Sequence, residues 1–169
     1  TRDGADLRRQ CSRNFPPEKT GNQHCQGFFL MLDCLQLSNM ANILIIEDEA
    51  NIARVLKDKL AHEGFQVQSF RSGPDALTFL AKAETHLPDL IILDILMPEM
   101  DGFQLAQTMQ AHPSWRRIPI IVLSVVTDDE RVRQIPARAF LSKPFKNAIL
   151  IETIRRVLAA EAGDTHGNT

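Results

Sequence analysis

The sequence lacks any hydrophobic run long enough to cross a membrane. Its longest apolar stretch near the start, residues 27–32, is far shorter than the roughly 18 residues that a membrane span needs. The polar segment before this stretch does not fit a signal peptide, and no polybasic segment suited to an anionic membrane surface is present. We therefore expect a cytoplasmic protein with no membrane partner.

Cysteine and net charge are also scarce. Three cysteines are an odd number and too few for a disulfide scaffold, which favours a reducing setting. The formal net charge is −2, whereas proteins that bind nucleic acid usually carry an excess of basic residues, so no direct nucleic-acid partner is expected. Hydrophobic residues make up 44% and charged residues 24% of the 169 residues, which is typical of one globular domain and excludes wholesale disorder.

The composition changes at Met40. Residues 1–39 hold all three cysteines and show no sustained periodicity, so we expect an N-terminal extension that is poorly ordered. Residues 40–162 alternate apolar runs with amphipathic stretches, which predicts a single folded domain. The polar residues 163–169 predict a disordered tail.

The extension contains one cluster that invites a metal-binding interpretation. Cys11, His24, Cys25 and Cys34 could be grouped as zinc ligands, but no two cysteines have the C-x₂-C spacing of zinc sites, which disfavours that reading. Residues 27–35 could form a short helix that packs on the domain, or could merely collapse.

Apolar runs and amphipathic stretches alternate regularly through the domain. Strands are predicted at residues 43–46, 65–70, 90–93, 120–123 and 139–141, and helices at residues 49–63, 74–81, 103–109, 128–135 and 150–158. The helix at 128–135 is short because Pro136 ends it, and its few apolar residues favour a mobile element. Buried strands joined by helices imply a parallel sheet that is covered on both faces.

Polar side chains stand where four of the predicted strands end. They are Glu47 and Asp48 after the first strand, Asp94 after the third, Ser124 after the fourth and Lys143 after the last. In open α/β sheets, ligands bind outside the carboxyl ends of the strands. The sequence therefore predicts three carboxylates, one hydroxyl and one ammonium group at a single edge of the sheet.

This set of groups suits phosphoryl transfer. Three crowded carboxylates repel one another, and a hard divalent cation such as Mg²⁺ relieves the repulsion. Asp94 can act as the nucleophile that attacks phosphorus, while Ser124 and Lys143 contact the phosphoryl oxygens.

Each of these residues also has an ordinary structural interpretation. Glu47 and Asp48 could cap a helix, Asp94 could be a turn residue, Ser124 a satisfied hydroxyl and Lys143 a solvent-facing cation. Their joint occurrence at four strand ends favours the functional interpretation over these separate ones.

Four segments carry a resemblance to a known family. They are ILIIEDE at residues 43–49, PDLIILD at 88–94, MPEMDG at 97–102 and KPF at 143–145. In combination they resemble the response-regulator receiver domain of two-component signalling, and the likeness covers residues 40–162. It implies a three-layer flavodoxin-like (βα)5 fold, with a parallel five-stranded sheet in the order 2-1-3-4-5.

The resemblance assigns roles to the acidic residues. It implies that Asp94 is the phosphoacceptor and that Mg²⁺ is held by Glu47, Asp48, Asp94 and the backbone carbonyl of Leu96. The phosphoryl donor would be a sensor histidine kinase or a histidine phosphotransfer protein. Catalysis would be limited to self-phosphorylation and dephosphorylation, so an enzyme in the usual sense is not expected.

The resemblance also implies a switch. Ser124 and Lys143 match the family's hydroxyl and lysine, with a cis Lys143–Pro144 bond that directs the ammonium into the pocket. Phe140 falls at the position of the family's switching aromatic, where inward movement would remodel the surface of the fourth helix, last strand and last helix. The alternative for Phe140 is a plain core aromatic.

Several positions depart from the family pattern. Glu47 stands where many members have Asp, and Phe140 replaces the commoner Tyr. Leu96 and Val126 place apolar groups beside the pocket, from which we hypothesise a slowly hydrolysed phospho-form. The short interval between Ser124 and Lys143 is more like that of receivers attached to hybrid kinases.

Three functions compete at this stage. The first is a phosphorylation-dependent switch, stand-alone or part of a larger protein, that acts on an effector elsewhere and can dimerise when phosphorylated. The second is a hydrolase with Asp94 as nucleophile, which Leu96 disfavours because such an enzyme needs a second acid at that position. The third is a degenerate receiver that serves as a phosphorylation-independent docking module.

Overall fold

The structure is a computed structural model, and it describes residues 40–83, 86–98, 100–125, 130 and 134–164. A compact unit begins at Met40. The predicted extension at 1–39, with its candidate zinc ligands and its 27–35 segment, lies outside the described residues. Most of the predicted helix at 128–135, together with Val126 and residues 165–169, also lies outside them.

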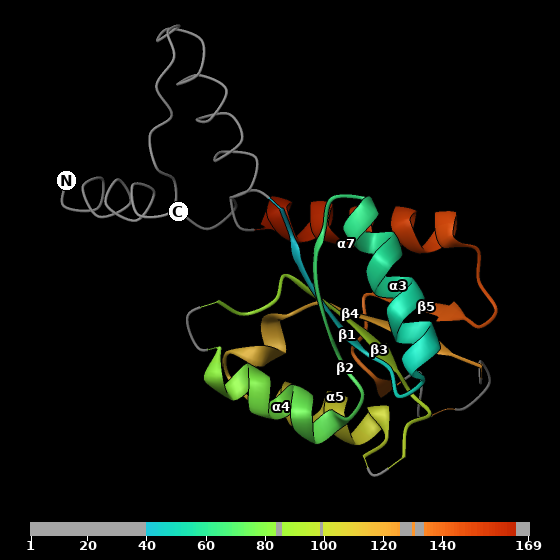
Figure 1. The fold of residues 1–169 in the computed structure, drawn as a ribbon. Helices are drawn as coiled ribbons and strands as arrows, with labels where there is room; N and C mark the ends of the chain where they lie inside the picture. The colour runs from blue at the N-terminus through green and yellow to red at the C-terminus, as the bar shows by residue number, and fades with distance from the viewer. Residues whose placement is uncertain (1–39, 84–85, 99, 126–129, 131–133, 165–169) are drawn as a thin grey trace, which may run out of the picture. The chain divides into compact units, whose positions relative to one another are not determined.

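Five parallel strands form one sheet at the centre of the unit (Figure 1). They are β1 (Asn42–Ile46), β2 (Gln66–Phe70), β3 (Leu90–Asp94), β4 (Ile120–Ser124) and β5 (Ala139–Ser142). Their order is β2-β1-β3-β4-β5, and all four neighbouring pairs are parallel. The predicted fold and strand order are therefore confirmed.

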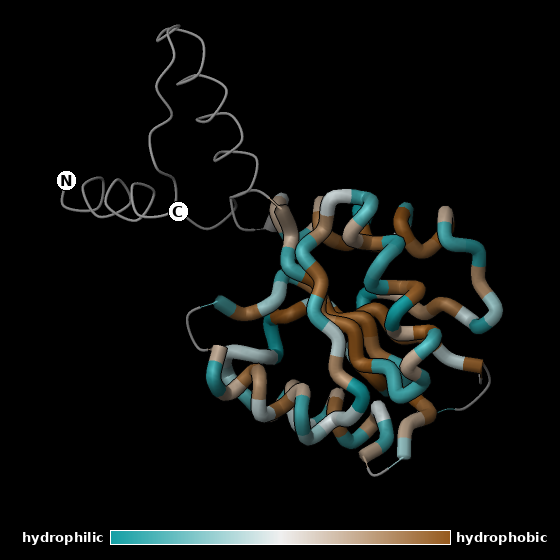
Figure 2. Tube along the Cα trace, in the orientation of Figure 1, coloured by the Kyte–Doolittle hydropathy of each residue, from teal (hydrophilic) through white to brown (hydrophobic). Residues whose placement is uncertain are grey.

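Helices cover both faces of the sheet. They are α3 (Ala50–His62), α4 (Gly73–Lys82), α5 (Gly102–Ala111) and α7 (Asn147–Asp164), with a short 3₁₀ helix, η1 (Trp115–Arg117). Residues of α4 and α5 share one core cluster with Leu44 and Ile46 of β1. Residues of α3 and α7 share the other with Ile43 and Ile45, because successive side chains of a strand point to opposite faces. Figure 2 shows the resulting hydrophobic centre.

The position of each strand in the sheet explains its composition. The central strands β3 and β4 are buried at every residue, which is why they consist almost entirely of apolar residues. The edge strand β2 is only partly buried and alternates glutamine with apolar residues. This alternation is typical of a strand with one face turned to solvent.

Local signals set several of the helix ends. The Ser72 side chain accepts a hydrogen bond from the Asp75 backbone N–H and caps α4, which begins with a proline in its first turn. Gly64, with φ of 90°, follows the end of α3, where glycine readily adopts the left-handed conformation that ends a helix. The last helix continues to Asp164, two residues beyond the predicted end of the domain at Ala162. The sequence favours an earlier end because glycine at position 163 is a poor helix former.

None of the helices that the structure describes is long and apolar enough to span a membrane.

Candidate functional site

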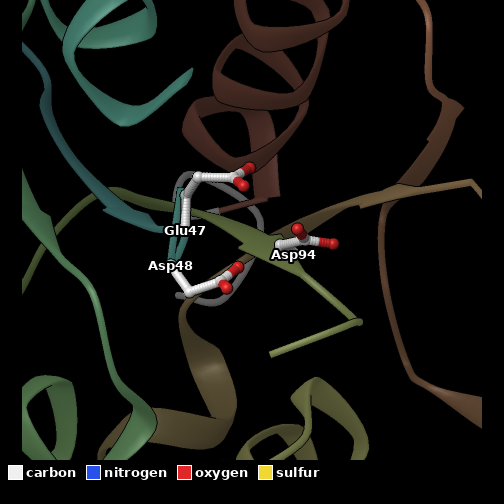
Figure 3. A group of neighbouring side chains, drawn as sticks. All are labelled: Glu47, Asp48 and Asp94. Atoms are coloured by element: carbon white, nitrogen blue, oxygen red, sulfur yellow. The ribbon is translucent and has the colours of Figure 1, made fainter. Parts of the chain in front are cut away.

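Three carboxylate side chains meet at the carboxyl ends of the strands (Figure 3). Glu47 and Asp48 follow β1, and Asp94 ends β3, the strand that pairs directly with β1. One oxygen from each residue lies within 4.8 Å of the others. Glu47 and Asp94 are buried and Asp48 is partly buried, so the cluster is largely withdrawn from water. The sheet thus brings together the three acids that the sequence singled out.

Lys143 joins two of these acids. Its Nζ donates to Glu47 Oε2 at 2.7 Å and to Asp94 Oδ2 at 2.8 Å, with only 14% of the side chain exposed. The backbone N–H of Lys143 donates to the Ser124 carbonyl at 2.8 Å, which fixes the lysine against the end of β4. The Lys143–Pro144 peptide bond is cis, as predicted.

One oxygen of Glu47 has no partner among the described residues. Glu47 Oε1 is buried and accepts no hydrogen bond in that part of the chain, although Oε2 is engaged by Lys143. A buried carboxylate oxygen left unpaired is costly unless it binds a proton or a cation. The unpaired oxygen and the three oxygen donors fit a hard divalent cation such as Mg²⁺.

Burial raises the pKa of Glu47 from 4.5 to about 7. The hydrogen bond from Lys143 opposes this shift, and the neighbouring charge of Asp94 adds to it. Without a bound cation, Glu47 therefore competes for a proton near neutral pH.

The pKa of Lys143 moves upward. Burial alone would lower it, but the hydrogen bonds to Asp94 and Glu47 and their negative charges together outweigh burial. The ammonium consequently remains charged and places a permanent cation beside Asp94.

The two carboxylate oxygens of Asp94 have different partners: one contacts the backbone of the following turn, and the other contacts Lys143. Its Oδ1 accepts a hydrogen bond from the Leu96 backbone N–H at 3.2 Å, while Oδ2 faces Lys143. The Leu96 side chain is exposed, and its place beside the pocket remains a prediction. The carbonyl of Leu96 remains a predicted metal ligand.

The structure decides several of the alternatives that the sequence left open. Glu49, not Glu47 or Asp48, precedes the first turn of α3, and its side chain makes no capping hydrogen bond. Lys143 does not face solvent. Ser124 is buried at the strand end, as both of its interpretations require. Phe140 is 46% exposed, so its interpretation as a plain core aromatic is wrong. The reason is that alternate residues of β5 face outward.

Arg71 is a residue of the site that the sequence did not indicate. Its Nε donates to the main-chain carbonyl of Asp48 at 3.0 Å and so ties the end of β2 to the segment that carries Asp48. The sequence around Arg71 predicts only that this residue lies in a turn. The signal that could have identified it is the predicted strand order, which places the ends of β2 and β1 side by side.

Gly102 lies so close to β3 that a side chain would not fit there. A Cβ at this position would lie 2.5 Å from the Asp94 carbonyl oxygen and 2.8 Å from the Ile95 Cα. The Gly102 N–H also donates to the Ile95 carbonyl at 3.0 Å, which holds the start of α5 against the segment that follows Asp94. The glycine thus supports the conformation of the chain next to the site.

Substitution of this glycine should disturb both the fold and the site. We expect Gly102→Ala to lower the free energy of unfolding by about 1–3 kcal/mol, because the backbone atoms that it meets cannot rotate away. Gly163→Ala is the matched control, since nothing lies within 4 Å of a Cβ there, and it should stabilise α7 by about 0.5–1 kcal/mol. Urea denaturation measures both, and equal stability of the two variants would contradict the close approach at Gly102.

Known proteins resemble this chain in sequence. A sequence model described as the response regulator receiver domain matches residues 43–155. Response regulator PleD of Caulobacter vibrioides is 35% identical over 119 residues, which cover 68% of this chain. The chain spans only about a quarter of PleD, since the match covers 25% of that protein. Polar-differentiation response regulator DivK of Brucella ovis is 32% identical over 120 residues, which cover 69% of this chain and 95% of DivK.

Solved structures agree with these sequence matches. The receiver domain of a signal transduction histidine kinase from Syntrophus aciditrophicus has 37% identity and a TM-score of 0.66, over 71% of this chain and 91% of that one. Chemotaxis response regulator CheY4 of Vibrio cholerae has 30% identity and a TM-score of 0.63, over 70% of this chain and 99% of that one. The chain therefore belongs to the response regulator receiver domain family of two-component signalling.

Proposed function

We propose that this domain is a phosphorylation-dependent switch in which Asp94 accepts a phosphoryl group. The observation that carries the proposal is the buried Lys143 ammonium, held 2.8 Å from Asp94 Oδ2 beside two further carboxylates. A cation fixed at this distance can pair with an oxygen of an incoming phosphoryl group. The donor is a phosphohistidine of a histidine kinase or a phosphotransfer protein, and we place the reaction in the cytoplasm.

The transfer uses groups that the fold has already oriented. A carboxylate oxygen of Asp94 attacks phosphorus, and the bond from phosphorus to the donor's imidazole nitrogen breaks as the aspartyl phosphate forms. Lys143 contacts one phosphoryl oxygen and the Ser124 hydroxyl contacts another. Glu47, Asp48 and the Leu96 carbonyl, with Asp94, would hold Mg²⁺, which when bound neutralises charge on the phosphoryl oxygens.

The response of the domain follows from the added charge. A phosphoryl group brings roughly one to two negative charges to Asp94, and Ser124 then moves toward it. Phe140, which is half-exposed on β5, can turn inward to fill the space that opens behind Ser124. This shift between two packings remodels the surface around β5 and α7 and changes the affinity for an effector or a second copy of the domain.

Phosphorylation of the purified protein tests the switch. With acetyl phosphate and Mg²⁺, we expect wild type to gain one phosphoryl group in intact-mass spectra, and Asp94→Asn to gain none. Beryllofluoride with Mg²⁺ should shift NMR resonances around β5 in wild type alone. An unmodified wild type would favour the docking module, and turnover of a phosphoester would favour the hydrolase.

The lifetime of the phospho-form depends on the apolar group beside it. The exposed Leu96 side chain cannot orient a water for attack on phosphorus, so we expect slow hydrolysis in wild type. Leu96→Asn supplies a polar group at the same place and should shorten the lifetime severalfold. Phosphate release from the purified protein measures both, and a wild-type lifetime of seconds would contradict the hypothesis.

A further inference from the structure

A second concave surface lies at the opposite edge of the sheet. A groove of about 780 Å³ runs past the amino ends of β3, β4 and β5, the edge from which the strand arrows start in Figure 1. Its walls come from the connections that precede these strands and from the end of α7. A five-residue strand spans about 16 Å, so the groove and the Asp94 site are separate.

Two arginines in this groove have no partner in the described part of the chain. Arg116 and Arg117 line it, are exposed, and make no side-chain hydrogen bond or ion pair with any residue that the structure describes. The third arginine of the groove, Arg138, pairs with Glu161 at 2.7 Å. Asp89, the other acid in the lining, accepts a hydrogen bond from the Asn42 N–H at 2.7 Å. The lining therefore holds two arginines that have no ion-pair partner among the described residues, and its three arginines outnumber its two acids by one.

The arginine pair is carried by a well-anchored segment. The ring of Trp115 stacks on His112 with centroids 3.8 Å apart and planes 17° apart. Backbone hydrogen bonds run from Arg116 N–H to the His112 carbonyl and from Ile118 N–H to the Trp115 carbonyl. Ile118 is buried and fixes the end of the segment in the core. Such anchoring reduces the entropy that must be lost when the arginines bind a ligand.

The chemistry of the groove indicates the kind of partner. A guanidinium group binds a carboxylate through two parallel hydrogen bonds, and Leu87, Pro88 and Pro119 offer apolar surface beside the arginines. The groove is open along its length, whereas small-molecule sites enclose most of the ligand surface. The net charge of −2 for the whole chain disfavours a nucleic acid as the ligand of this groove.

We propose that this groove docks an acidic, extended segment of a partner protein, whose carboxylates pair with Arg116 and Arg117.

Binding of a defined acidic peptide tests the docking site. The probe is a fluorescein-labelled peptide of about twelve residues with the repeat Glu-Leu-Glu-Ser, titrated with the full chain at physiological salt and followed by fluorescence anisotropy. We expect the double variant Arg116→Ala/Arg117→Ala to raise the Kd at least tenfold. The conservative variant Arg116→Lys/Arg117→Lys should bind more tightly than the alanine variant but less tightly than wild type. Lysine retains the positive charge but cannot form the two parallel hydrogen bonds that a guanidinium group makes with a carboxylate.

A matched control separates the groove from general electrostatic attraction. Arg155 and Arg156 are another adjacent, exposed arginine pair, on α7, in which Arg155 pairs with Glu63 at 2.8 Å; replacing both by alanine changes the formal net charge by the same amount. This control should leave the Kd within twofold of wild type. An equal loss in both double variants, or no binding by wild type, would overturn the proposal. So would displacement of the peptide by an equimolar single-stranded oligonucleotide or by inorganic phosphate.

The outcome is independent of the proposed phosphorylation. The variant Arg116→Ala/Arg117→Ala should fold with the wild-type circular dichroism spectrum and take up a phosphoryl group from acetyl phosphate as wild type does. Failure of Asp94 to be phosphorylated would leave the peptide titration unaffected, and failure of the titration would leave the phosphorylation result unaffected.

Discussion

Replacement of Lys143 by alanine should lower the free energy of unfolding of the metal-free protein by about 3 kcal/mol at pH 8. The expected loss is large because the lysine pairs with two carboxylates that are both buried. Removing one partner of a buried ion pair leaves an uncompensated charge and costs about 3–5 kcal/mol. We expect a loss at the lower end of this range because 14% of the lysine side chain is exposed. Urea denaturation in the presence of a chelator measures the effect.

The same substitution should slow phosphoryl uptake. Without the ammonium, charge that develops on the phosphoryl oxygens loses a fixed partner, and we expect the rate with acetyl phosphate to fall about 10²-fold. Mg²⁺ should return part of the lost stability, because a cation among the three acids replaces some of the missing positive charge.

Lys146→Ala provides the control for the Lys143 substitution. Lys146 is an exposed cation three positions along the chain, and its side chain makes no ion pair with the described residues. We expect its loss to change the free energy of unfolding by less than about 0.5 kcal/mol. Equal stability of the two alanine variants at pH 8 would contradict the buried ion pairs.

Glu47 should make the metal-free protein less stable as the pH rises. Its pKa is raised from 4.5 to about 7 in the folded state, so the folded protein holds this proton more tightly than the unfolded chain does. The stabilising effect is fully present below about pH 4.5 and is lost as the pH rises through about 7. Each pKa unit corresponds to about 1.4 kcal/mol, so the whole change amounts to about 3.5 kcal/mol at most.

Glu47→Gln should remove this pH dependence. Glutamine has no proton to lose in this range, so we expect a nearly constant contribution from position 47 between pH 5 and pH 8. Mg²⁺ should stabilise wild type most above pH 7, where the carboxylate is ionised, and should stabilise the glutamine variant much less. Guanidine denaturation at several pH values, with and without Mg²⁺, measures both effects.

The neighbouring Glu49 supplies the control for position 47. It is exposed, and its side chain makes no capping hydrogen bond, so Glu49→Gln should retain the wild-type pH profile. A wild-type stability that is flat between pH 5 and pH 8 without metal would show that burial does not perturb Glu47.

Much of this architecture could be predicted from the sequence because it depends on short-range patterns. The wholly apolar runs of β3 and β4 identify central strands, and a polar residue after each strand falls at the carboxyl edge of a parallel sheet. The sequence alone is therefore sufficient to predict that Glu47, Asp48 and Asp94 lie together. The resemblance to the family supplied the strand order and the cis bond before Pro144.

Other features depend on long-range geometry that no local pattern encodes. The hydrogen bond from Arg71 to the Asp48 carbonyl requires β2 and β1 to be neighbours in register, and nothing in the turn sequence signals it. The double ion pair of Lys143 requires the ends of β1, β3 and β5 to converge. The exposure of Phe140 depends on which face of the edge strand β5 is covered, which the four residues of that strand do not reveal.

The bridge made by Lys143 has a consequence for biosynthesis. Its contacts with Glu47 and Asp94 join residues 96 and 49 positions apart along the chain. A nascent polypeptide that has emerged only as far as β4 contains the acids but no ammonium to neutralise them. The acid cluster therefore gains its fixed positive charge only when β5 has been synthesised and has joined the sheet, so the electrostatic arrangement at this edge is completed by the last strand of the chain.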